Sequence, residues 1–166
     1  MPSHATFSSP TPDRSTVMYC GFESHEVDPL HFAVECGAID EIQELLEDED
    51  ENYDINERNY SGHTPLMVAA MNSNLEEVMR FLLKAKADTN AVGADIDDVD
   101  NKGEVSALIL AASEGSVAGM KILLDAKAKV NLKCKSRMPT ALFHAAGTGS
   151  AEKVKLLLDE IGRAHV

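Results

Sequence analysis

The 166-residue chain has no tryptophan, and only 5% of its residues are aromatic, so its core must be built from smaller aliphatic side chains. Its three cysteines are odd in number and far apart, which favours reduced thiols over a disulfide framework or a zinc site. No apolar run approaches the roughly 20 residues of a membrane-spanning helix, and no signal peptide is recognisable. These absences indicate an intracellular protein without a membrane partner, and we favour the cytoplasm over the nucleus.

Basic residues are also scarce, with 15 Lys and Arg against 28 Asp and Glu. The excess of acid is uneven: residues 1–100 hold 22 acidic and 5 basic residues, whereas residues 101–166 hold 6 and 10. An acidic chain repels polyanions at long range, so a nucleic-acid partner is not expected. Runs of acidic residues are otherwise typical of solvated faces and loops.

Residues 1–26 contain three of the six prolines among serines and threonines, and show no sustained hydrophobic period. Such a segment buries too little apolar area to offset its conformational entropy. We therefore expect residues 1–26 to form a disordered N-terminal tail.

From residue 27 onward, one pattern recurs four times. Its first apolar block occurs as Asp28-Pro-Leu-His-Phe-Ala33, Thr64-Pro-Leu-Met-Val-Ala69, Ser106-Ala-Leu-Ile-Leu-Ala111 and Thr140-Ala-Leu-Phe-His-Ala145. A second apolar block follows each of these, at residues 42–46, 78–83, 120–124 and 154–158. Leucines at equivalent places are 36, 42 and 34 residues apart: Leu30, Leu66, Leu108 and Leu142. A unit of this size predicts a solenoid of stacked repeats.

The pattern resembles the ankyrin repeat, whose units carry Thr-Pro-Leu-His, a pair of small alanines and a closing Ala-Asp-x-Asn. The resemblance implies an all-α solenoid of helix-turn-helix units with β-turn fingers. Helix pairs are then expected near residues 29–47, 65–85, 107–126 and 140–159. The units are placed at residues 27–58, 59–91, 100–132 and 135–159, with an acidic insertion at 92–99. We interpret residues 160–166 as a non-native tail joined to a truncated chain, because residues 161–166 match what a common sequencing adapter encodes.

Particular residues suit this architecture. The residues Asp28, Thr64, Ser106 and Thr140 are suitable N-caps. Glycines at 37, 115 and 149 suit left-handed turns after the first helix of a unit. Lysines replace the glycine that the family places after the second helix, at Lys86 and Lys127. If the backbone is left-handed there, each lysine costs on the order of 1 kcal/mol relative to glycine.

Residues that suggest chemistry have structural explanations. By resemblance, His31 bridges neighbouring backbone groups and supports the fold. The acidic run Asp95, Asp97, Asp98 and Asp100 fails as an EF-hand, because a lysine and an isoleucine stand at ligand positions. No phosphate loop and no catalytic triad have supporting spacing. We therefore expect no enzyme activity, no cofactor and no metal site.

The basic run Lys127, Lys129, Lys133, Lys135 and Arg137 lacks the interleaved aromatics of a nucleic-acid platform. It is either a local contact for an acidic protein segment or a solvated surface. Separately, some ankyrin asparagines are β-hydroxylated when a leucine stands eight residues before and an acid two before. Asn90 has Leu82 and Asp88 at those places, so the resemblance implies a candidate hydroxylation site. A structural role for Asn90, bonding within its finger, is the alternative.

Two functions agree with these features. The first is a monomeric scaffold or adaptor that binds a partner protein on its concave face and finger tips, with self-association through an uncapped last repeat. The second is the targeting fragment of a larger ankyrin-containing kinase, ubiquitin ligase or channel. The resemblance assigns partner contacts to Tyr60, Ser61, His63, Met71, Asn72, Asn101, Lys102, Glu104, Ser113, Glu114, Ser136, Arg137, Gly147 and Thr148.

Overall fold

The computed structural model describes residues 28–48, 53–94, 104–133 and 140–163. The predicted tail at 1–26 lies outside these ranges, as does most of the acidic insertion. The described residues form four helix pairs, and each pair falls on a predicted unit. The helices are α1 (Pro29–Cys36), α2 (Ile39–Glu47), α3 (Pro65–Met71), α4 (Glu76–Lys84), α5 (Ala107–Ser113), α6 (Val117–Asp125), α7 (Ala141–Gly147) and α8 (Ala151–Arg163). The predicted helix pairs are thereby confirmed.

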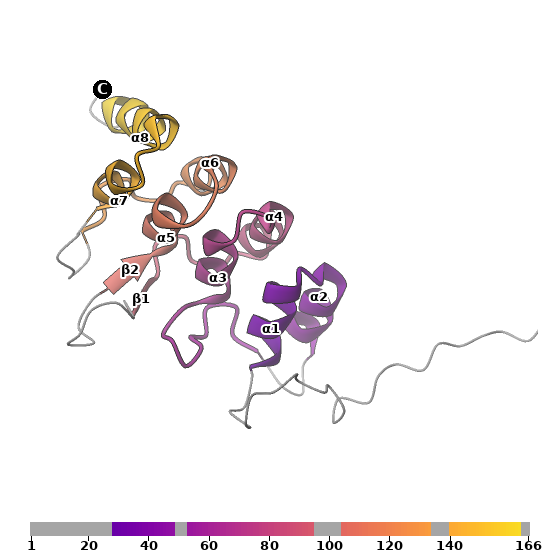
Figure 1. Cartoon of the computed structure of the whole chain (residues 1–166). Helices are drawn as coiled ribbons and strands as arrows, with labels where there is room; N and C mark the ends of the chain where they lie inside the picture. Colours follow the sequence, from indigo (N-terminus) through magenta and orange to yellow (C-terminus); the bar gives the residue numbers. More distant parts are fainter. Residues whose placement is uncertain (1–27, 49–52, 95–103, 134–139, 164–166) are drawn as a thin grey trace, which may run out of the picture.

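The pairs stack into one array. The first helices of the units, α1, α3, α5 and α7, lie side by side in one row, and the second helices form a second row beside them (Figure 1). The described parts of the loops that join successive units, at residues 53–64, 85–94 and 126–133, project from the row of first helices (Figure 1). These loops correspond to the predicted fingers, so the architecture is the expected helical solenoid.

The loop before α5 contains the two strands of the described chain, β1 (Val92–Ala94) and β2 (Glu104–Ser106). They pair antiparallel, with Val92 opposite Ser106. Val105, which the repeat pattern left as an extra residue, is 4% exposed and belongs to the core. A Cβ on Gly93 would lie 2.5 Å from the carbonyl oxygen of Gly62, so this hairpin packs closely against the preceding finger.

The predicted N-caps are confirmed at all four first helices. The shortest capping bond runs from the Leu30 N–H to Asp28 Oδ1, at 2.9 Å. The hydroxyls of Thr64, Ser106 and Thr140 accept from the N–H three residues on, at 3.3 to 3.4 Å. These bonds satisfy amide groups that the first turn of a helix leaves without partners.

Left-handed residues occur at most of the predicted places. Gly37 and Gly149 have φ of 73° and 70°, and Lys86 and Lys127 have φ of 71° and 67°. The expectation for Gly115 was wrong, because its φ is not positive. A Cβ on Gly115 would lie 2.2 Å from the Ala70 carbonyl oxygen, so glycine is needed there for the close approach of α5 to α3.

The α8 helix contains the predicted second apolar block at 154–158 but continues to Arg163, beyond the expected end of the pair at residue 159. Arg163 Nη1 lies 2.6 Å from Glu160 Oε2, one helical turn earlier. Residues 160–163 therefore continue the helix of the fourth unit, and residues 164–166 of the interpreted tail lie outside the described ranges.

The core is one cluster of buried side chains, mostly leucine, alanine, methionine and isoleucine, that runs through all four units. The repeated leucines Leu30, Leu66 and Leu108 are at most 2% exposed, as expected for anchoring residues. Leu142, the equivalent leucine of the fourth unit, is only partly buried. Burial of this apolar cluster between neighbouring units is what stabilises a solenoid.

Lys153 joins the third and fourth units in a way that the repeat pattern did not indicate. It is 8% exposed, and its Nζ donates to the carbonyl oxygens of Ala111 at 3.3 Å and Ala112 at 2.9 Å. These carbonyls belong to the last turn of α5, where no intrahelical donors remain. Burial lowers the pKa of the Lys153 ammonium below its ordinary value of 10.5.

Candidate protein-binding surface

The inter-unit loops begin with a tight turn that is repeated in three units. The N–H of Glu57 donates to the Asp54 carbonyl at 2.9 Å, that of Ala91 to Asp88 at 3.3 Å, and that of Leu132 to Lys129 at 3.1 Å. The equivalent turns therefore begin at Asp54, Asp88 and Lys129. Each turn has an asparagine as its third residue.

These asparagines link one turn to the next. Asn56 Oδ1 accepts from the Asp88 N–H at 2.7 Å, and Asn90 Oδ1 accepts from the Lys129 N–H at 2.8 Å. The Asn90 N–H in turn donates to Asp88 Oδ1 at 2.9 Å. Asn90, the candidate hydroxylation site, is thus half-buried and bonded to its own turn and to the next unit. The structural role considered for Asn90 is present.

The second finger is held by Asn59, whose Oδ1 accepts from the N–H groups of Ser61 and His63, each at 3.0 Å. Gly62 completes the turn with φ of 76°. Tyr60 stands at the tip and is 96% exposed, while Ser61 is half-buried. A large aromatic side chain is therefore presented to solvent on a backbone that hydrogen bonds fix.

His63 does not belong to this exposed tip. It is 5% exposed, and its carbonyl oxygen accepts from Nε2 of His31 at 2.9 Å. Nδ1 of His31 lies 2.6 Å from Asp28 Oδ2. His31 therefore bridges its own N-cap and the neighbouring finger, and its structural role is confirmed, although one of its two partners is a side chain. Because this bridge holds His63 against the first unit, little of His63 is open to a partner.

Six further predicted contact residues lie at the C-terminal ends of α3, α5 and α7. Four of them are exposed and two are half-buried: Asn72, Glu114, Gly147 and Thr148, then Met71 and Ser113. Two hydroxyls bond back to their own helix, that of Ser113 to the Leu110 carbonyl at 3.1 Å and that of Thr148 to the Ala145 carbonyl at 2.8 Å. The structure therefore brings these residues to one edge of the first-helix row.

The remaining predicted contacts fall largely outside the described residues. Asn101, Lys102, Ser136 and Arg137 belong to the parts of the third and fourth fingers that the structure does not describe. The backbone of Glu104 is in β2. Of the basic run, Lys135 and Arg137 are likewise outside the described ranges.

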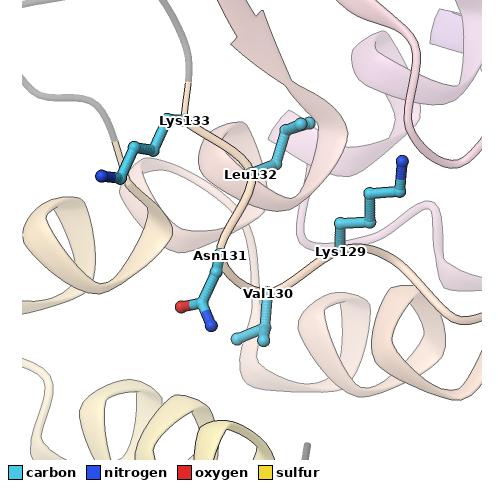
Figure 2. Close-up of a pocket in the computed structure, with 5 residues that line it drawn as sticks. All are labelled: Lys129, Val130, Asn131, Leu132 and Lys133. Atoms are coloured by element: carbon cyan, nitrogen blue, oxygen red, sulfur yellow. The ribbon is translucent and has the colours of Figure 1, made fainter.

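Three lysines of the basic run are described, and all are exposed: Lys127, Lys129 and Lys133. None of them forms an ion pair with another described residue. Residues 129–133 line an open hollow on the surface, drawn in Figure 2. Val130 and Leu132 are half-buried there, whereas Asn131 is exposed. The hollow therefore combines cationic, amide and apolar groups.

Within the described parts of the chain, no three His, Cys, Asp or Glu side chains come together as a metal site. Over the same residues, none of the helices is long and apolar enough to cross a membrane.

Stacked helix pairs with projecting fingers define a repeat solenoid, a class of protein that presents one extended face to its partners. The family model for ankyrin repeats, in three copies, matches residues 15–93 and 91–165. The chain belongs to the ankyrin repeat family, whose repeats mediate protein–protein interaction and are generally not catalytic.

Two curated relatives agree with this assignment. The human transient receptor potential cation channel subfamily A member 1 is 38% identical over 110 residues, which cover 66% of this chain and 9% of the channel. The mouse B-cell lymphoma 3 protein homolog is 34% identical over 137 residues, covering 82% of this chain and 29% of that protein. The chain therefore spans less than a third of the length of either relative.

Proposed function

We propose that the chain is an interaction scaffold or adaptor whose finger tips and first-helix edge bind a partner protein. The observation that carries this proposal is Tyr60, 96% exposed at the tip of a finger that Asn59 fixes. Tyrosine is enriched among the residues that dominate protein interfaces, and it has few rotatable bonds to immobilise. A protein partner is the ligand that best explains such a residue on this fold.

The rest of the edge supports the same role. Asn72, Glu114 and Thr148 are exposed at equivalent helix ends in successive units, so one partner can cross several repeats. The back-bonded hydroxyls and the fixed fingers limit the ordering that binding requires from this side. Pre-organisation of this kind raises affinity by lowering the entropic cost of association.

The test is quantitative affinity capture with the full chain as bait. Wild type is compared with Tyr60→Ala and with Lys121→Ala, a control on the exposed side of α6 in the second-helix row. We expect a set of proteins to be lost with Tyr60→Ala and kept with Lys121→Ala. Identical sets from all three baits contradict the proposed surface.

An alternative is that the array is the targeting part of a longer ankyrin protein, such as a kinase, ubiquitin ligase or channel. It is favoured by the relatives, because the chain covers 9% of a cation channel and 29% of a second protein. Sequencing the locus tests it: an open reading frame that continues past Asp159 into further repeats supports the alternative, and a stop codon after Val166 refutes it.

Asn90 is proposed as a β-hydroxylation site on the sequence pattern given above. The Asn90 side chain is half-buried between two units, so a hydroxylase must first break the hydrogen bond from the Lys129 N–H to Asn90 Oδ1. Mass spectrometry of the peptide that contains Asn90, from protein isolated from its own cells, tests the assignment. Its unmodified mass throughout contradicts it.

A further inference from the structure

The third of the repeated turns lacks a carboxylate that the first two possess. Asp54 Oδ1 accepts from the Asn56 N–H at 2.9 Å, and Asp88 Oδ1 accepts from the Asn90 N–H at 2.9 Å. In the third turn, the residue equivalent to these aspartates is Lys129. No described residue accepts from the Asn131 N–H. No described residue therefore fills the position that two carboxylates fill in the earlier turns, and it is called the open position below.

The backbone around this position is held in place although the carboxylate is missing. The Lys129 N–H donates to Asn90 Oδ1 at 2.8 Å, which joins the turn to the preceding unit. The Leu132 N–H donates to the Lys129 carbonyl at 3.1 Å and closes the turn. The Asn131 N–H is thus presented on a fixed loop, which lowers the cost of ordering it on binding.

The surroundings of the open position are cationic and partly apolar. In Figure 2 the side chains of Lys129 and Lys133 extend to opposite sides of the turn, whereas those of Val130 and Asn131 point in a similar direction. The two lysines are exposed and form no ion pair within the described ranges. Cations that diverge in this way suit several acids spaced along a chain better than a single small anion.

We propose that the hollow at residues 129–133 binds an acidic protein segment. One carboxylate of that segment accepts from the Asn131 N–H and takes the place that Asp54 and Asp88 fill in their own turns. Neighbouring acids pair with Lys129 and Lys133, and an apolar side chain contacts Val130. The inference rests on the proposed function, to which it adds the chemical class of the partner and one contact site.

Protein is favoured over nucleic acid by two observations. Among the described residues, the lining of the hollow contains no aromatic side chain on which a base could stack. The chain as a whole carries a formal net charge of −13, which opposes the approach of a polyphosphate. A short acidic segment carries fewer negative charges than a polyphosphate, so the same field opposes its approach less.

The test uses fluorescence anisotropy with the full chain and a fluorescein-labelled peptide of alternating aspartate and leucine. Lys129→Ala and Lys129→Asn remove the same charge, but the asparagine side chain can also fill the open acceptor position. We expect Lys129→Ala to weaken binding severalfold and Lys129→Asn to weaken it by about tenfold more, since the peptide then loses a charge-assisted hydrogen bond. Lys121→Ala, an exposed lysine on α6, is the matched charge control and should bind as wild type does.

Each other outcome overturns the proposal. Equal affinities of Lys129→Ala and Lys129→Asn show that the Asn131 N–H is not used, and equal losses with Lys121→Ala show only long-range charge. Tighter binding of a labelled oligothymidylate of equal charge identifies a nucleic-acid site. Urea midpoints of the variants confirm that they fold. Failure here, with Tyr60-dependent capture intact, rejects the hollow and leaves the scaffold function standing.

Discussion

Replacing Lys86 with glycine should stabilise the protein, although it removes a side chain and a charge. Lys86 has φ of 71°, a left-handed conformation that costs an L-residue roughly 1–2 kcal/mol. Glycine avoids this cost but loses more chain entropy on folding, by about 0.5–1 kcal/mol. Lys86 is exposed and has no ion pair among the described residues, so no contact offsets the change. The net gain in the free energy of unfolding is about 0.5–1 kcal/mol.

Equilibrium unfolding in urea measures the gain as a higher midpoint at unchanged slope. The control is Lys84→Gly, which removes the same charge two residues earlier, from the last turn of α4. That substitution should lower the free energy of unfolding by about 1 kcal/mol, because glycine is a poor helix former. A lower midpoint for Lys86→Gly, or shifts of the same sign in both variants, refutes the reasoning.

Three further predictions concern packing and charge. Leu108→Ala should cost about 2–5 kcal/mol and Met71→Ala distinctly less, because Leu108 is 2% exposed and Met71 is half-buried; comparable urea midpoints contradict this. Gly115→Ala should destabilise by about 1–3 kcal/mol through the Ala70 carbonyl, whereas Gly147→Ala, with nothing within 4 Å, should not destabilise; thermal melts of the pair decide. Lys153→Met should cost about 1–3 kcal/mol, since two carbonyls lose a donor. Because burial lowers the pKa of Lys153, the unfolded chain binds more protons than the folded chain at pH values between the folded-state pKa and 10.5. The contribution of Lys153 to the free energy of unfolding therefore rises with pH through this window, and Lys153→Met should remove that part of the pH dependence.

The helices and their ends could be predicted because they depend on residues close in sequence. The N-caps precede their helices directly, and the left-handed lysines stand where the repeat places glycine. Repetition also limits the structures that fit the sequence, since four copies of one pattern are expected to share one local structure. The sequence therefore sufficed for the architecture.

Residues whose roles depend on a neighbouring unit were harder to predict. Gly115 was assigned a turn conformation but serves a close approach between α5 and α3. His63 was assigned to the surface, yet the His31 bridge from the first unit holds it inside. Lys153 bonds to carbonyls more than forty positions earlier, for which the sequence carries no local signal. Inter-unit packing decides all three.

The candidate site was partly visible in the sequence. Repeat alignment places Asp54, Asp88 and Lys129 in register, so the exchange of acid for base could be read directly. The loss of a hydrogen-bond acceptor could not be predicted from the sequence, because the bond between the aspartate and the N–H two residues on is a feature of the folded turn. The basic run was thus recognised as a charge pattern, and the structure adds the open acceptor position.

Because of the asparagine bonds that link successive turns, two backbone amides report on the contact between neighbouring units. The Asp88 amide is covered by a side chain 32 residues earlier, and the Lys129 amide by one 39 residues earlier. Hydrogen exchange at each amide therefore requires opening of the boundary between two units and not only of the turn that carries it. Measured together, the two exchange rates separate the coupling across the first boundary from that across the second, which are the terms that set cooperativity in a one-dimensional array.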